Sequence, residues 1–268
     1  MFDRFTPRRV RTLFLSDFHL GMKGCQPERI LDFLRHHEAD TIYLAGDVVD
    51  FWALRRAWNW PASHNLVVQK LLRKARKGTR IVYIPGNHDE FLRDYPNISF
   101  GGIEIRLDAI HRTADGRKLL VTHGDQCDAV VRYSPVLSLF GSIAYLAVFN
   151  ASRIVNAVRH RTGRPYWSLS VWAKSKVKDA SRFMRAYEAA LASEARRAGA
   201  DGVVCGHIHL AGMREIDGIE YINAGDWVES CTAIAEDFDG SLELIRWTER
   251  AVSLDPVDFN QLDDRKAA

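Results

Sequence analysis

Six short, apolar and largely β-branched segments punctuate this chain, and their spacing constrains the fold more than any other feature. Segments of this length and composition are typical of strands buried on both faces. Helical periodicity between the first three predicts an α/β layered fold. The expected strands are 11–16, 41–45, 80–85, 119–122, 202–205 and 220–222, the expected helices between the first three are 27–36 and 65–76, and a hairpin is expected over 103–121 with its turn at Asp115-Gly116.

Polar residues with metal-binding side chains follow the first five of these segments, several of them next to glycine. Ligands of open α/β sheets bind in the crevice at the carboxyl ends of the strands. We therefore expect these side chains to meet at one edge, where glycines permit tight turns and close backbone approach. In chain order they are Asp17 and His19, Asp47, Asn87 with His88 and Asp89, His123, and His207 with His209.

Carboxylate, imidazole and amide oxygen together suit borderline divalent metals such as manganese, iron or zinc. Each motif alone is weak, because Gly-Asn-His-Asp is also a common turn sequence and a single histidine after a strand is more often structural. Five motifs in this order are far more specific, and the set is large enough for two ions about 4 Å apart. One ion would take Asp17, His19, Asp47 and His209, and the other Asp47, Asn87, His123 and His207.

The motifs DFH, GD, GNHD, HGD and GHIH, in this order over about residues 10–230, resemble those of the calcineurin-like metallophosphoesterases. The resemblance implies a four-layer α/β/β/α sandwich with a dinuclear metal site, where activated water attacks phosphorus. It also implies that His88 stabilises the transition state or protonates the leaving oxygen, and that Asp89 orients His88. The alternative for Asp89 is a helix cap.

Residues between Asp125 and Cys205 depart from the strand–helix rhythm, and two long helices are expected there, at 135–160 and 168–198. We interpret 129–199 as a helical insertion, or lid, within one domain of 268 residues, followed by a polar tail at 249–268. Residues 131–187 carry ten lysines and arginines against one aspartate, a net formal charge of +9 within a chain total of +3. The first helix is also apolar over more than one face, which fits either burial or contact with acyl chains and an anionic membrane.

Within the family, the sequences GDVVDFW and HGDQCD and the helical insertion before GHIH resemble the UDP-2,3-diacylglucosamine diphosphatases of lipid A synthesis. The resemblance implies manganese-dependent hydrolysis to UMP and a diacylated sugar 1-phosphate at the cytoplasmic membrane face. Those enzymes commonly have arginine at the position of His88, which leaves another lipid phosphate or nucleotide-diphosphate lipid open as the substrate. A phosphoesterase of soluble nucleotides is a second hypothesis, and a non-catalytic binding module, which would require lost ligands, is a third. Candidate substrate contacts are Trp52, Arg132, Arg159 and Arg164.

The N-terminal residues have no secretory-signal pattern, and the four widely spaced cysteines include no CxxC pair. Together these features predict reduced thiols and a cytoplasmic protein, for which a peripheral position on the cytoplasmic membrane face is the alternative. Basic charge alone would also fit nucleic acid, but no reading motif supports it. The sequence makes no prediction of oligomeric state.

Overall fold

The computed structural model describes residues 6–128, 155, 159 and 178–248 of the chain, and two β-sheets form its centre. The seven-stranded sheet has the order β12-β11-β1-β2-β3-β5-β4, and the five-stranded sheet has the order β6-β7-β8-β10-β9. The first contains β1 (Arg8–Leu15), β2 (His37–Ala45), β3 (Arg80–Ile84), β4 (Ser99–Phe100), β5 (Ile103–Ile105), β11 (Thr232–Glu236) and β12 (Leu242–Arg246). The second contains β6 (Ala109–Arg112), β7 (Lys118–Val121), β8 (Gly202–Cys205), β9 (Gly212–Ile216) and β10 (Ile219–Asn223).

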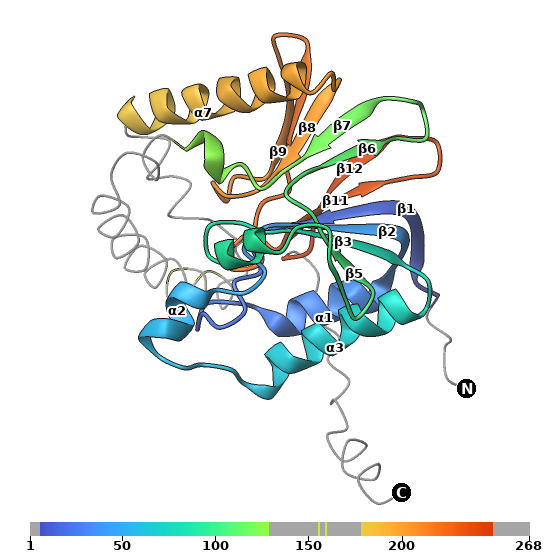
Figure 1. Ribbon diagram of the computed structural model, residues 1–268, viewed down its shortest axis with the longest axis vertical. Coiled ribbons are helices and arrows are strands. Elements are labelled where there is room, and N and C mark those ends of the chain that lie inside the picture. The colour runs from blue at the N-terminus through green and yellow to red at the C-terminus, as the bar shows by residue number, and fades with distance from the viewer. Residues whose placement is uncertain (1–5, 129–154, 156–158, 160–177, 249–268) are drawn as a thin grey trace, which may run out of the picture.

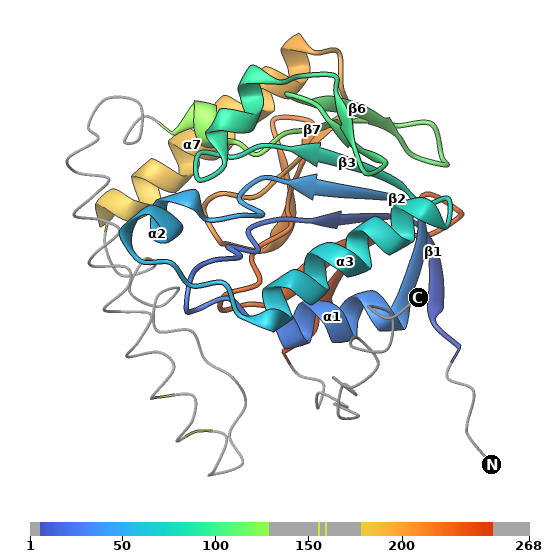
Figure 2. The same cartoon turned by 60° about the horizontal axis from the view of Figure 1, so that its bottom comes forward.

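All six strands expected from the sequence are present. Strands β1, β2 and β3 run parallel in one sheet, and β7, β8 and β10 run parallel in the other. The carboxyl ends of β1, β2 and β3 point toward the short helix α2 (Phe51–Arg56), as Figure 2 shows. This arrangement collects the loops that follow the strands along one edge of the molecule.

Helices cover the outer face of each sheet and complete the four layers seen in Figure 1. Helices α1 (Pro27–His36) and α3 (Ala62–Arg76) lie side by side on the seven-stranded sheet (Figure 2). Helix α7 (Lys178–Arg197) lies along the five-stranded sheet. The predicted α/β/β/α sandwich is therefore confirmed.

Side-chain alternation along the strands explains why the sheets are covered on both faces. In β1, Leu13 and Leu15 belong to the core beneath α1 and α3, whereas Phe14 belongs to the core between the sheets. A third core joins α7 to the outer face of the five-stranded sheet and includes Tyr187 and Leu191. Successive residues of a strand point to opposite faces, so a continuous apolar run can fill two layers at once.

One region differs from the sequence prediction. The hairpin is formed by β6 and β7 alone, because Ile103–Ile105 pairs in parallel with β3 in the other sheet. The described part of the predicted helix 168–198 is α7, whose residues Tyr187, Leu191 and Ala195 are buried against the five-stranded sheet. The predicted helix 135–160, apart from residues 155 and 159, and the predicted tail 249–268 lie outside the described residues.

Among the described residues, no helix combines the length and the apolar character that crossing a membrane requires.

Candidate metal centre and active site

Five of the predicted ligands have a left-handed backbone conformation, which is uncommon for residues other than glycine. Their φ angles are 54° for Asp17, 52° for His19, 51° for Asp47, 69° for His207 and 53° for His209. Each such residue costs on the order of 1–3 kcal/mol, and such strain gathers at functional sites. The turns after β1, β2 and β8 therefore hold these side chains at an energetic cost that the surrounding fold offsets.

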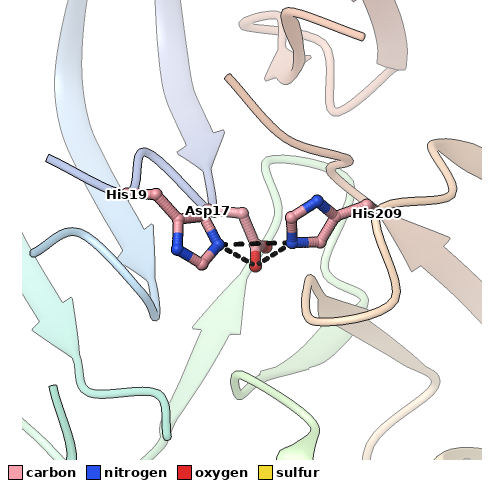
Figure 3. Close-up of side chains that lie close together, drawn as sticks. All are labelled: Asp17, His19 and His209. Atoms are coloured by element: carbon pink, nitrogen blue, oxygen red, sulfur yellow. Dashed lines mark hydrogen bonds and ion pairs between the residues drawn. The ribbon is translucent and has the colours of Figure 1, made fainter. Parts of the chain in front are cut away.

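One cluster joins the loop after β1 to the loop after β8, as Figure 3 shows. The Oδ1 atom of Asp17 lies 3.1 Å from Nε2 of His209 and 3.6 Å from Nε2 of His19. The two imidazole Nε2 atoms are 3.3 Å apart. All three residues are buried or nearly so, and their ligand atoms converge on one point, as a shared cation requires.

A second cluster surrounds the carboxylate of Asp47. Its Oδ2 atom lies 3.4 Å from Nε2 of His123, 3.8 Å from Nε2 of His19 and 3.9 Å from Nε2 of His88. The Oδ1 atom of Asn87 is 3.3 Å from Nε2 of His123, and a ring nitrogen of His207 belongs to the same group. Asp47 thus stands between the two clusters, where one carboxylate could serve two ions.

Hydrogen bonds at the far side of the rings present the Nε2 atoms to the site. Nδ1 of His123 lies 2.9 Å from the carbonyl oxygen of Ala45, and Nδ1 of His19 lies 3.2 Å from Oδ2 of Asp50. A proton on Nδ1 satisfies both contacts and leaves a lone pair on Nε2. Metal-binding histidines are held in this way by a second hydrogen bond.

Two glycines are required by the closeness of this packing. A Cβ atom at Gly46, which has φ +91°, would collide with the ring of His123, and one at Gly86 would collide with the Asp47 carboxylate. Gly46 comes directly after β2, and Gly86 comes two residues after the end of β3. Glycine there allows the backbone to approach the ligands of a neighbouring loop.

The charges of the clustered groups oppose the effect of burial on their pKa values. Burial raises the pKa of Asp17, but the charge of His209 and the nearby imidazole of His19 outweigh it and hold that pKa well below its usual range. Burial lowers the pKa of His123, but the Asp47 carboxylate overcomes this and raises it to about 10. The buried carboxylates therefore demand positive charge, which a proton on an imidazole or a metal ion can supply.

The site fits divalent cations by its donor set and by one unsatisfied atom. Within the described part of the chain, Oδ1 of Asp17 is buried and makes no hydrogen bond, although Nε2 of His209 lies 3.1 Å away. A buried acceptor in this state is costly unless something binds it. The oxygen and imidazole nitrogen donors around it match the preferences of manganese, iron or zinc.

The carboxylate beside His88 differs from the predicted one. Asp89 accepts hydrogen bonds from the backbone amides of Val48 and Gly86 and from the hydroxyl of Tyr83. It is fully buried and fastens the loop after β3 to the loop after β2. Oδ1 of Asp50 instead lies 2.9 Å from Nδ1 of His88. The orienting role expected of Asp89 is thus available to Asp50.

The predicted substrate contacts are only partly within the described residues. The Trp52 ring lies over His88, with 4.2 Å between the ring centroids and 32° between the planes, so it forms one wall beside the candidate acid. Arg159 is half-buried. Arg132 and Arg164 lie outside the described residues.

Sequence reasoning missed Asp50 and Asp128, both of which contact site histidines. Asp50 lies three residues after Asp47, also caps α2 through the amide of Ala53, and is reached by His19 and His88. Asp128 Oδ2 lies 2.8 Å from Nε2 of His207. The segments GDVVDFW and HGDQCD contained both residues, but the contacts depend on tertiary packing between separate loops.

Comparison with known proteins agrees with this geometry. Residues 10–211 match the family model described as calcineurin-like phosphoesterase. A "UDP-2,3-diacylglucosamine hydrolase" of Neisseria meningitidis is 27% identical over 237 residues, which cover 85% of this chain and 95% of the relative. A protein of the same name from Porphyromonas gingivalis is 30% identical over 125 residues, or 44% of this chain and 47% of that protein.

Among solved structures, the Escherichia coli phosphoesterase YfcE superposes with a TM-score of 0.43 at 15% identity, covering 88% of this chain and 98% of that one.

Proposed function

Because the chain belongs to the calcineurin-like phosphoesterase family, and is therefore a metal-dependent phosphoester hydrolase, we propose that it cleaves the pyrophosphate of UDP-2,3-diacylglucosamine. The products would be UMP and diacylglucosamine 1-phosphate. The observation that carries the proposal is the position of Asp47 between two imidazole clusters. The Neisseria relative, which aligns over 95% of its length at 27% identity, supports this choice of substrate.

Two divalent ions, most suitably manganese, would be held by the two clusters, with Asp47 shared. Asp17, His19 and His209 would complete the first set, and Asn87, His123 and His207 the second. Bound ions supply positive charge to the phosphate oxygens and lower the pKa of water at neutral pH.

His88 is the residue we assign to proton transfer. Its Nε2 atom faces the Asp47 carboxylate at 3.9 Å, Asp50 lies at its Nδ1, and Trp52 covers its ring. Hydrolysis of the pyrophosphate joins the oxygen of water to one phosphorus and breaks its P–O bond to the other phosphate. Negative charge develops on the phosphate oxygen that leaves, and a proton neutralises it. His88 can donate that proton while Asp50 fixes the ring orientation.

Lipid recognition is assigned to residues 131–187, where the sequence is apolar and carries a net formal charge of +9. A segment that is rich in both apolar and basic residues would suit both the acyl chains and an anionic bilayer. The protein would then act at the cytoplasmic face of the membrane, with Trp52, Arg132, Arg159 and Arg164 as candidate substrate contacts.

A substrate panel tests the proposal directly. Wild type and the His88→Arg variant would be given UDP-2,3-diacylglucosamine, the same UDP-sugar without acyl chains, and phosphatidic acid, each with Mn²⁺ and after chelation. We expect Mn²⁺-dependent release of UMP from the acylated UDP-sugar and far slower release without acyl chains. Equal cleavage of both UDP-sugars would favour a soluble nucleotide substrate. Turnover of phosphatidic acid alone would favour another lipid phosphate.

A further inference from the structure

The turn formed by the HGDQCD segment, residues 123–128, contains two buried carboxylates outside the proposed ligand set. The short helix η2 (Asp125–Cys127) follows His123, and Asp125 and Asp128 are each 7% exposed. Carboxylates this deeply buried are costly unless they are paired. Each of the two faces a different loop of the metal centre.

Asp125 connects the turn to the loop after β3. Its Oδ1 atom accepts a hydrogen bond of 2.6 Å from the guanidinium of Arg93. The same guanidinium donates to the carbonyl oxygen of Pro85 at 2.9 Å. Pro85 lies two residues before Asn87, so this bridge fixes the distance between the loop that bears Asn87 and the loop that bears His123.

Asp128 connects the turn to the loop after β8. Its Oδ2 atom lies 2.8 Å from Nε2 of His207. A proton shared there commits Nε2 to the carboxylate and leaves Nδ1 of His207 for a metal. Such a carboxylate–histidine pair fixes both the orientation and the tautomer of a ligand.

The turn itself is held firmly against α7. The amides of Cys127 and Asp128 donate to the carbonyl oxygens of Gly124 and Asp125 at 2.9 and 3.0 Å. Gly124 has φ +105°, and a Cβ atom there would collide with the hydroxyl of Tyr187 on α7. The turn can therefore hold the loops that it contacts in fixed positions.

We propose that Asp125 and Asp128 are positioning residues for one of the two ions, because the turn controls Asn87, His123 and His207 together. The other cluster has separate support, since Ser16 donates to Asp17 and Asp50 lies beside His19. This inference rests on the proposed function, because it takes the ligand assignments from it. It follows that damage to the turn should weaken the binding of one ion and leave the binding of the other unchanged.

Calorimetric titration of Mn²⁺ into the chelator-stripped full chain tests the inference. Asn87→Ala and His209→Ala identify which binding step belongs to which cluster. We expect Asp128→Ala and Asp125→Ala to lower the Mn²⁺ affinity of the step that Asn87→Ala removes by about 10–100-fold. The Mn²⁺ affinity of the step that His209→Ala removes should stay within about twofold of wild type. Asp128→Asn, which keeps an acceptor for His207, should recover part of the loss.

Two further variants separate positioning from general stability. Arg93→Gln changes a partly exposed residue, so it keeps the test available if the buried variants fail to fold, and it should weaken the same step. Glu236→Gln alters a buried ion pair elsewhere and should leave both steps unchanged. Equal weakening of both steps, or wild-type affinity in Asp128→Ala and Arg93→Gln, would overturn the inference. Failure of wild type to bind Mn²⁺ would instead overturn the proposed function.

Discussion

Two buried groups of imidazole and carboxylate, at different places in the sandwich, differ in how their charges are satisfied. Around Glu236 on β11 the protein supplies every partner itself: Arg11, His111 and the amide of Ala114 all contact the carboxylate. At the strand ends around Asp17 and Asp47, by contrast, the Nε2 atoms of His19 and His209 lie 3.3 Å apart, and Oδ1 of Asp17 makes no hydrogen bond within the described residues.

The Glu236 group joins the two sheets, because Glu236 and Arg11 belong to one sheet and His111 to the other. Burial raises the pKa of Glu236, but hydrogen bonds from His111 and Thr12 outweigh it and lower that pKa to about 2. Because its partners are complete, we interpret the Glu236 group as a purely structural link between the two sheets. The incomplete set at the strand ends instead marks a site built for an added cation.

Replacement of the shared carboxylate should have the largest effect on activity. Asp47→Asn removes charge between the two clusters, so we expect kcat/KM to fall on the order of 10³-fold or more and Mn²⁺ binding to weaken. Steady-state kinetics and calorimetry measure both quantities. Activity within tenfold of wild type would show that Asp47 does not join two ions.

Loss of the proposed acid should have the next largest effect. His88→Gln should lower kcat on the order of 10²–10³-fold while Mn²⁺ binding stays close to wild type. Asp50→Asn, which keeps an acceptor for the amide of Ala53 but removes the charge beside His88 and His19, should cost about 10–100-fold. Rapid-quench assays at saturating metal give these values, and a variant that loses metal and activity in parallel would contradict the separate role of His88.

Substitution in the Glu236 group should instead lower stability and leave activity unchanged. Glu236→Gln should lower the free energy of unfolding by about 3 kcal/mol in urea denaturation at pH 7, with activity of the folded protein preserved. The pKa of Glu236 is lower in the folded state, so its stabilisation is present above about pH 4.5 and is lost as the pH falls toward about 2. Wild type should lose this increment on acidification and the variant should not.

The smallest expected effect is the change of Mn²⁺ affinity with each unit of pH. The pKa of His123 is raised to about 10 in the folded, metal-free protein. The proton on His123 therefore stabilises this form fully below pH 6.5, and that stabilisation is lost as the pH rises toward 10. A bound metal must displace that proton, so Mn²⁺ affinity should rise by up to about tenfold per pH unit until the pH approaches 10. Titrations in buffers of different ionisation enthalpy count the protons, and a pH-independent affinity would contradict this.

The strands and ligand-bearing loops could be predicted because their signals are local. Leu13 to Leu15 is apolar over a strand's length, and Asp17 follows at once. Strand β11 was missed because Thr232–Glu236 contains two alanines and a glutamate, although every one of its residues is buried. Its burial depends on pairing with β1, which adjacent sequence does not encode.

The partners of the ligands were harder to predict for the same reason. Asp50 and Asp128 resemble ordinary loop aspartates, and only the folded chain brings them to His88 and His207. Ile103 was placed in the wrong sheet because hairpin geometry is the nearest local solution, whereas the chain crosses between sheets after β5. Local pattern thus fixes elements, and tertiary packing decides their neighbours.

Metal analysis of the purified chain is the most direct test of the central claim that the strand-end cluster holds two catalytic cations. Mass spectrometry of the metal content, combined with hydrolysis of an activated phosphodiester, would measure it. We predict two equivalents of Mn²⁺ bound per chain, loss of activity on chelation and its return with Mn²⁺. A chain that binds no divalent metal and hydrolyses no phosphodiester would contradict the account.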